Sequence, residues 1–183
     1  IAKQPDYDKN RRILHPLLRL VLPVICKIEV TGLDNVPHDG KTCIMISHTT
    51  YLDPIVVTHA IPFRYVISLS KAENFRIPVV GWLIKKWGGY PINRGKVDRK
   101  ALMQTIELMK SEQLVLMAPE GTRHPEGLAQ AKDGLAYIAS KADAVIVPTA
   151  ICGAQDWITR LKRFRRAYTR INFGKPFKFK TGG

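Results

Sequence analysis

Short apolar runs alternate with helical patterns along most of this 183-residue chain, and this alternation constrains the fold more than any other feature. Apolar runs bounded by turn residues are typical of buried strands, whereas apolar residues at helical spacing are typical of helices. The predicted strands cover residues 43–46, 65–69, 114–118, 145–151 and 169–173. The predicted helices cover residues 53–60, 77–87, 98–110 and 131–142. The pattern predicts a single α/β domain with a largely parallel or mixed central sheet flanked by helices.

The N-terminal segment, residues 1–27, has a different character from the predicted α/β domain over residues 28–183. Apolar residues recur there at helical spacing: Ile13, Leu14, Leu17, Leu18, Val21 and Leu22. Basic residues surround them: Lys9, Arg11, Arg12, Arg19 and Lys27. We predict an amphipathic helical segment, which suits a membrane surface but also suits packing on the domain. No segment has the roughly 18–20 uninterrupted apolar residues that a membrane span needs.

The balance of charge is strongly basic, with 29 Lys and Arg residues against 15 Asp and Glu residues and a formal net charge of +14. This excess predicts a polyanionic partner, which can be nucleic acid, anionic lipid headgroups or a phosphorylated substrate. The three cysteines lie far apart, which excludes a disulfide scaffold and a Cys-x-x-Cys metal site. Cys43 and Cys152 lie in apolar runs, so we expect buried thiols.

The motif Ser47-His48-Thr49-Thr50-Tyr51-Leu52-Asp53-Pro54 contains the first candidate catalytic pair. His48 follows a predicted strand, where catalytic groups of α/β sheets collect, and Asp53 is predicted to be the N-cap of the next helix. One Asp53 oxygen can cap the helix while the other accepts a hydrogen bond from the His48 ring. The second ring nitrogen would then be free to act as a base. A purely structural histidine hydrogen bond is the alternative.

The motif Ala118-Pro119-Glu120-Gly121-Thr122-Arg123 follows another predicted strand and contains a candidate anion site. Arg123 can bind a phosphate through two hydrogen bonds, and the Thr122 hydroxyl and backbone amides add donors. Gly121 permits a close approach or an unusual φ. Glu120 fits such a site only if it pairs with an arginine. The alternative is a tight turn with a surface Glu–Arg pair.

Two further cations are weaker candidates for the same edge of the sheet. Arg94 follows a short strand bounded by glycines, and Lys71 follows the predicted strand over residues 65–69. Each can bind substrate or be a solvated surface cation. The run Val147-Pro148-Thr149-Ala150-Ile151 is interpreted as a buried strand whose side chains serve packing.

The order of these motifs resembles the four sequence blocks of the glycerolipid acyltransferase family. The blocks are Ser-His-x-x-x-x-Asp, Gly-Gly-Tyr-Pro-Ile-Asn-Arg, Pro-Glu-Gly-Thr-Arg and Val-Pro-Thr-Ala-Ile. Within the family, the chain is most similar to the lysophosphatidic acid acyltransferases, over about residues 28–176. It departs from the usual pattern at Ser47, Asn93 and Ala118.

The resemblance implies acyl transfer from a thioester, acyl-CoA or acyl carrier protein, to the free hydroxyl of 1-acylglycerol 3-phosphate. The product would be phosphatidic acid in phospholipid biosynthesis. His48 would be the general base oriented by Asp53, without a covalent acyl-enzyme, a bound cofactor or a metal. Arg94 and Arg123 would hold the phosphate of the acceptor, with Lys71 as a third candidate. The alternatives are another acceptor (glycerol 3-phosphate or a different lysophospholipid) or a non-catalytic lipid-binding member of the fold.

A second basic region, residues 157–170, adds to the case for a membrane partner. Trp157, Leu161 and Phe164 are spaced as on one helix face, among many arginines. Such a stretch suits an anionic membrane, and the alternative is a solvated helix whose apolar stripe is core. Either basic region can instead bind CoA phosphates or an acidic carrier protein. We expect a peripheral or monotopic protein at the cytoplasmic face of a membrane, and no nucleic-acid partner, because no recognised nucleic-acid-binding motif is present.

Overall fold

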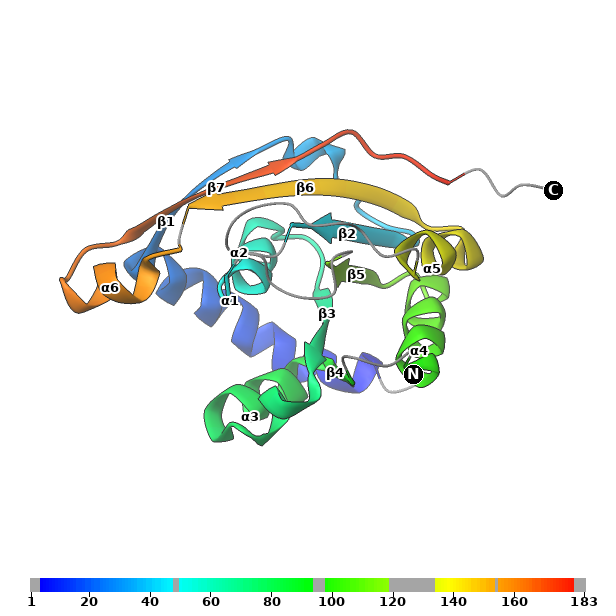
Figure 1. Ribbon diagram of the computed structural model, residues 1–183, viewed down its shortest axis with the longest axis horizontal. Coiled ribbons are helices and arrows are strands. Elements are labelled where there is room, and N and C mark those ends of the chain that lie inside the picture. The colour runs from blue at the N-terminus through cyan, green and yellow to red at the C-terminus, as the bar shows by residue number, and fades with distance from the viewer. Residues whose placement is uncertain (1–3, 48–49, 94–97, 119–133, 154, 180–183) are drawn as a thin grey trace.

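A computed structural model describes residues 4–47, 50–93, 98–118, 134–153 and 155–179 of the protein (Figure 1). Its centre is a seven-stranded sheet in the order β1-β7-β6-β2-β5-β3-β4. The strands are β1 (Cys26–Thr31), β2 (Thr42–Ile46), β3 (Val66–Lys71), β4 (Tyr90–Ile92), β5 (Leu114–Met117), β6 (Val145–Gly153) and β7 (Ala167–Phe173). Neighbouring strands are parallel except β6 and β7, which pair antiparallel. The predicted α/β fold with a largely parallel sheet is confirmed.

The helices also follow the predicted pattern closely. They are α1 (Asp8–Ile25), α2 (Asp53–Ala60), α3 (Pro78–Trp87), α4 (Arg99–Lys110), α5 (Gly134–Ala142) and α6 (Trp157–Lys162). Short 3-10 helices cover Gln4–Tyr7, Leu33–Asn35 and Ala72–Arg76. Asp98 is the N-cap of α4, as predicted, and its carboxylate accepts a hydrogen bond from the Ala101 amide at 3.0 Å. The first residues of the predicted helix 131–142 lie outside the described residues.

The two faces of the sheet carry separate hydrophobic cores, because successive side chains of a strand point to opposite faces. Ile44 and Ile46 of β2 belong to one core, together with Val56 of α2. Cys43 belongs to the other core, which α4 and α5 cover. Cys43 is buried, as predicted, and burial raises the pKa of its thiol to about 12. The prediction for Cys152 is wrong, because Cys152 lies near the end of β6 on its exposed face.

Helix α1 buries Arg11, His15 and Leu22 against the protein and exposes a stripe of apolar side chains to solvent. Arg11 is 1% exposed, and its Nε donates a hydrogen bond to the Trp87 carbonyl at 2.8 Å. The His15 Nε2 lies 3.1 Å from the Thr58 carbonyl oxygen, to which it donates. The exposed apolar side chains are Ile13, Leu17, Leu20, Val21 and Val24. The helix therefore packs on the domain, and Arg11 is a structural residue rather than one of the surface cations that we expected.

None of the helices in the described part of the chain combines the length and the apolar character needed to cross a membrane.

Candidate active site

The carboxyl ends of the parallel strands meet at one edge of the sheet, which we call the carboxyl edge. Figure 1 shows β2 and β6 pointing the same way along the sheet, toward α6. Strand β5 lies between β2 and β3, so the chain that leaves β5 at Ala118 emerges between the segments carrying Asp53 and Lys71. Sites in open α/β sheets collect at this edge. The topology therefore brings the ends of all the predicted motif strands together.

Asp53 is buried at this edge, and Thr50 holds its carboxylate. Asp53 is only 1% exposed. The Thr50 amide donates to Oδ2 at 2.7 Å, and the Thr50 hydroxyl donates to Oδ1 at 2.6 Å. Two donors on two oxygens fix the plane of the carboxylate. Asp53 can therefore act as a rigid acceptor for a neighbouring group.

The prediction that Asp53 is the N-cap of α2 is wrong by one position. Leu52 is the N-cap, and Asp53 is the first helical residue. The Asp53 carboxylate reaches back to Thr50, whose hydroxyl also accepts a hydrogen bond from the Leu52 amide at 3.2 Å. The Asp53 carboxylate accepts from the Thr50 backbone amide, as the acidic residue of a capping box does, whereas the Asp53 amide donates to the Thr50 carbonyl and not to its hydroxyl. The spacing Thr50-x-x-Asp53 was the sequence signal for Thr50, which our motif analysis left without a role.

Helix α2 is itself anchored, which keeps Asp53 in place. The Thr58 hydroxyl donates to the Pro54 carbonyl at 2.8 Å, and the Thr58 carbonyl accepts the hydrogen bond from His15 of α1. Val56 and Val57 are completely buried against the sheet. The start of α2 therefore cannot shift without disturbing the α1–α2 contact and the core.

Most of the other predicted site residues lie outside the described part of the chain. These residues are His48, Arg94, Glu120, Gly121, Thr122 and Arg123. Their roles therefore stay predictions. The structure does show where the flanking residues lie, and those residues are at the carboxyl edge.

Hydrogen bonds join Asn93 and Asp98, the described residues on either side of the segment that contains Arg94. The Asp98 carboxylate accepts from the Asn93 backbone amide at 3.0 Å and from the Asn93 side-chain amide at 3.2 Å. The hydrogen bonds from the Asn93 and Ala101 backbone amides hold the pKa of the Asp98 carboxyl below its usual value. Asn93, one of the departures from the family pattern, therefore has a structural role next to Arg94.

Lys71 lies at the carboxyl edge, at the end of β3. In the β3–β4 register it is paired with Ile92, two residues before Arg94. Its side chain is 46% exposed, and Nζ lies 3.2 Å from Glu73 Oε1. The position suits a ligand of the acceptor phosphate, although Glu73 already neutralises part of its charge.

The Val-Pro-Thr-Ala-Ile run forms the middle of β6, directly beside β2. Pro148 is paired with Met45 and Thr149 with Ile46, the last residue of β2. Val147, Thr149 and Ile151 are buried. The packing interpretation is confirmed, and this strand supports the start of the segment that leads to His48.

The predicted amphipathic stretch over residues 157–170 is only partly helical. Trp157 packs against the core, and α6 ends at Lys162. Phe164 follows the helix with a positive φ of 54° and is fully exposed. Phe164 therefore does not share a helix face with Trp157, and the residues from Ala167 onward form β7.

The protein is an α/β protein with a buried, oriented carboxylate at the carboxyl edge of its sheet. Comparisons with known proteins define its family. The family model described as Acyltransferase matches residues 27–152. The chain is 30% identical over 145 residues to the 1-acyl-sn-glycerol-3-phosphate acyltransferase of Streptococcus pneumoniae, covering 78% of this chain and 53% of that protein. It is 32% identical over 158 residues to a chloroplastic 1-acyl-sn-glycerol-3-phosphate acyltransferase of Brassica napus, covering 80% and 45%.

A solved structure has the same fold. The crystal structure of the 1-acyl-sn-glycerophosphate (LPA) acyltransferase, PlsC, from Thermotoga maritima matches with a TM-score of 0.72 at 22% identity. The match covers 96% of this chain and 74% of that one. Since the family model covers more than half of the chain, the chain belongs to the Acyltransferase family, and the resemblance found in its motifs is confirmed. The chain spans about half the length of the two curated relatives named above.

Proposed function

We propose that this chain transfers a fatty acyl group from a thioester donor to the free hydroxyl of 1-acylglycerol 3-phosphate, giving phosphatidic acid for phospholipid biosynthesis. The family membership and the names of the relatives support this proposal. The observation that carries it is the buried Asp53 carboxylate, which Thr50 orients at the end of the segment that contains His48. A histidine that is to work as a base needs such an acceptor to set its tautomer.

In this proposal His48 takes the proton of the acceptor hydroxyl as the oxygen attacks the thioester carbonyl. An alcohol is a weak nucleophile at neutral pH, so this proton transfer is a main part of the acceleration. The carbonyl–sulfur bond breaks after attack, and the thiolate leaves with the proton from His48. Arg94, Arg123 and Lys71 bind the phosphate of the acceptor and so place its hydroxyl beside His48, while Glu120 orients Arg123 or binds an acceptor hydroxyl.

A thiol-release assay over a matrix of donors and acceptors tests the proposal. The purified chain is mixed with acyl-CoA or acyl carrier protein, and with 1-acylglycerol 3-phosphate, glycerol 3-phosphate or a lysophospholipid without a terminal phosphate. We expect the fastest release with 1-acylglycerol 3-phosphate. Faster release with another acceptor would reassign the substrate. Lipid binding without thiol release from any pair would indicate a non-catalytic lipid-binding member of the fold.

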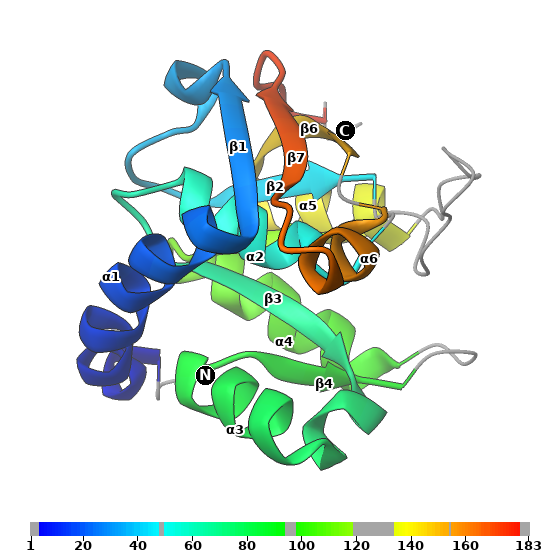
Figure 2. The same ribbon diagram turned by 90° about the vertical axis from the view of Figure 1, so that its left-hand side faces the viewer.

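We also propose that the chain docks on an anionic bilayer through α1 and α3, as a peripheral or monotopic protein at the cytoplasmic face. Helix α3 lies beside α1 (Figure 2). Besides the outward stripe of α1, α3 exposes Val79, Trp82 and Leu83, and Gly81 is its one buried residue. Exposed cations flank both helices: Arg12, Arg19, Lys85 and Lys86. Exposed apolar surface on this scale marks an interaction site, and the surrounding cations favour an anionic membrane.

Pelleting with vesicles of phosphatidylcholine alone or with added phosphatidylglycerol tests the docking surface. We expect binding to the anionic vesicles, and weaker binding by the variant Leu20→Gln/Trp82→Gln. The variant Met103→Gln changes an exposed side chain of α4, on the other side of the sheet, and is the matched control. Equal binding of all three proteins would contradict the assignment, and a gel shift with generic DNA would contradict the absence of a nucleic-acid partner.

A further inference from the structure

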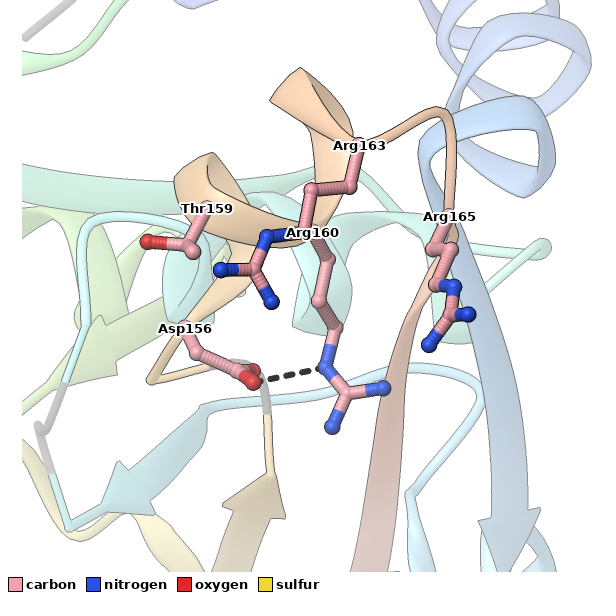
Figure 3. A pocket seen from close by; sticks show the side chains of 5 residues that line it. All are labelled: Asp156, Thr159, Arg160, Arg163 and Arg165. Atoms are coloured by element: carbon pink, nitrogen blue, oxygen red, sulfur yellow. Dashed lines mark hydrogen bonds and ion pairs between the residues drawn. The ribbon is translucent and has the colours of Figure 1, made fainter.

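A small pocket beside α6 gathers basic side chains that the proposed chemistry does not use. It has a volume of about 140 Å³ and is lined by Asp156, Thr159, Arg160, Arg163 and Arg165. Figure 3 shows Arg160 extending from the helix, whereas Arg163, directly after the last helical residue, and Arg165 belong to the segment that follows it. Three guanidinium groups and one carboxylate give the pocket an excess of two positive charges.

The arginines of the pocket differ in their hydrogen-bond and ion-pair partners. Arg160 donates to Asp156 at 2.7 Å, so its guanidinium has a fixed direction. Within the described residues, neither Arg163 nor Arg165 has an ion pair or a side-chain hydrogen bond, which leaves their donors available to a ligand. Because guanidinium groups match phosphate oxygens in geometry and charge, the chemistry of the pocket suits a phosphate group.

The pocket lies beside the candidate active site rather than in it. Helix α6 begins shortly after β6 ends, at the edge toward which β2 also runs (Figure 1). Trp157 of α6 packs against the hydrophobic core to which Leu52, the residue before Asp53, and Val56 of α2 belong. A ligand held in the pocket can therefore extend along the carboxyl edge toward Asp53.

We propose that this pocket binds a phosphate group of the acyl donor, an inference that rests on the proposed acyl transfer. In both acyl-CoA and acyl carrier protein, a pantetheine arm separates phosphate from the thioester, so the phosphate binds away from the reacting carbonyl. The acceptor phosphate, by contrast, is only a few bonds from its reacting hydroxyl and must bind close to His48. The pocket, on an element that packs against the same core as the start of α2, therefore fits the donor.

Calorimetric titration with CoA measures binding at the pocket without relying on turnover. The variant Arg163→Ala/Arg165→Ala removes two exposed guanidinium groups that have no ion pair or side-chain hydrogen bond to the described residues. We expect its Kd for CoA to rise about tenfold or more, since hydrogen bonds to charged groups commonly carry that much affinity. Pantetheine, which has no phosphate, should bind all variants alike.

Two further variants make the titration specific. Lys162→Ala/Lys175→Ala removes the same charge from exposed positions outside the pocket, and its Kd for CoA should stay within about twofold of the parent value. Arg163→Lys/Arg165→Lys keeps the charge but loses the forked donors, so it should recover part of the affinity. An unchanged Kd of the Arg163→Ala/Arg165→Ala variant for CoA, together with an unchanged KM for acyl carrier protein, would overturn the proposal. So would weakened vesicle binding by that variant alongside normal CoA binding, because the pocket would then serve the membrane.

Steady-state transfer with acyl-CoA and with acyl carrier protein identifies the source of the phosphate. The Arg163→Ala/Arg165→Ala variant should raise the KM for at least one donor while leaving the KM for the acceptor unchanged. A higher KM for one donor only assigns the pocket to that donor, and no change for either overturns the proposal. If the proposed function is wrong, the parent protein itself will release no thiol with any donor, whatever its affinity for CoA. This result is distinct from a failure of the pocket assignment, in which the parent protein is active.

Discussion

Arginines at the two ends of the sheet are used in opposite ways. At the amino end, Arg64 donates hydrogen bonds to the carbonyls of Pro37, Asp39, Gly40 and Glu112 and to the Thr42 hydroxyl, at 2.7–3.1 Å. At the carboxyl edge, Arg163 and Arg165 have no such partner among the described residues, and they line a pocket. At the amino end the guanidinium donors bind loop carbonyls of the protein, whereas at the carboxyl edge the donors of Arg163 and Arg165 are available to a ligand.

The contrast between Arg64 and the pocket arginines shows that some cations of this basic chain stabilise the fold, whereas others are available for binding. Burial lowers the pKa of the Arg64 guanidinium, although Asp39 and Glu112 oppose that shift. The protein oxygens around this guanidinium replace the hydration that it loses on burial. A cation for an external phosphate must instead keep unsatisfied donors, and it contributes little to stability. The two ends should therefore respond differently to mutation: the amino end in stability and the carboxyl edge in activity.

The largest effect is expected from His48→Ala at the carboxyl edge. Removing the general base should lower the transfer rate by about 10²–10⁴-fold, with no comparable loss of thermal stability. Thiol release and the thermal unfolding midpoint of the same preparation measure the two quantities. A folded variant with the turnover of the parent protein would refute the assignment of the base.

The second prediction concerns Arg64→Met at the amino end. The change leaves several carbonyl groups without their donor, and we expect the free energy of unfolding to fall by about 2–3 kcal/mol. Urea unfolding measures this loss, and Arg163→Met, at the exposed residue that follows α6, is the matched control with an expected change within about 0.5 kcal/mol. Activity per folded molecule should stay that of the parent protein for Arg64→Met, because Arg64 is remote from Asp53 in the sheet. Equal stability losses for the two variants would remove the distinction between the ends.

The smallest effect is expected from Thr50→Val, which acts through Asp53. The change keeps the shape of the side chain but deletes the 2.6 Å hydrogen bond to the carboxylate. We expect kcat to fall about tenfold with an unchanged KM for the acceptor, consistent with about 1.4 kcal/mol of lost orientation. Thr50→Ser retains the hydroxyl and should restore kcat. If Thr50→Val and Thr50→Ser were equally slow, Thr50 would be a packing residue and not a positioning residue.

Local patterns in the chain predicted its elements well, because each pattern depends on neighbouring residues. Asp98 was identified as a helix cap, and the apolar runs over β2, β5 and β6 were identified as strands, all of which the structure confirms. Strand β1 was missed although Lys27, Glu29 and Thr31 alternate with Cys26, Ile28 and Val30, because a solvated strand has only this weak period-two signal.

The candidate site was predictable as a set of residues but not as an arrangement. Asp53 was chosen from its spacing to His48, yet its main contacts with Thr50 follow from the turn that precedes α2. Arg11 was counted with the surface cations, and only the packing of α1 against α3 shows that it is buried. Cys152 was expected in the core because an apolar run cannot tell which face of a strand is covered.

The sequence by itself therefore determined the alternation of strands and helices, the family, and the residue types available for acyl transfer and phosphate binding. The tertiary structure decided the strand order that places β5 between β2 and β3, the inward turn of Arg11 and His15, and the pocket formed by Arg160, Arg163 and Arg165. The physical reason is the range of the interactions. Periodicity and capping act over a few neighbouring residues, whereas burial and convergence of charges depend on contacts between segments far apart in the chain.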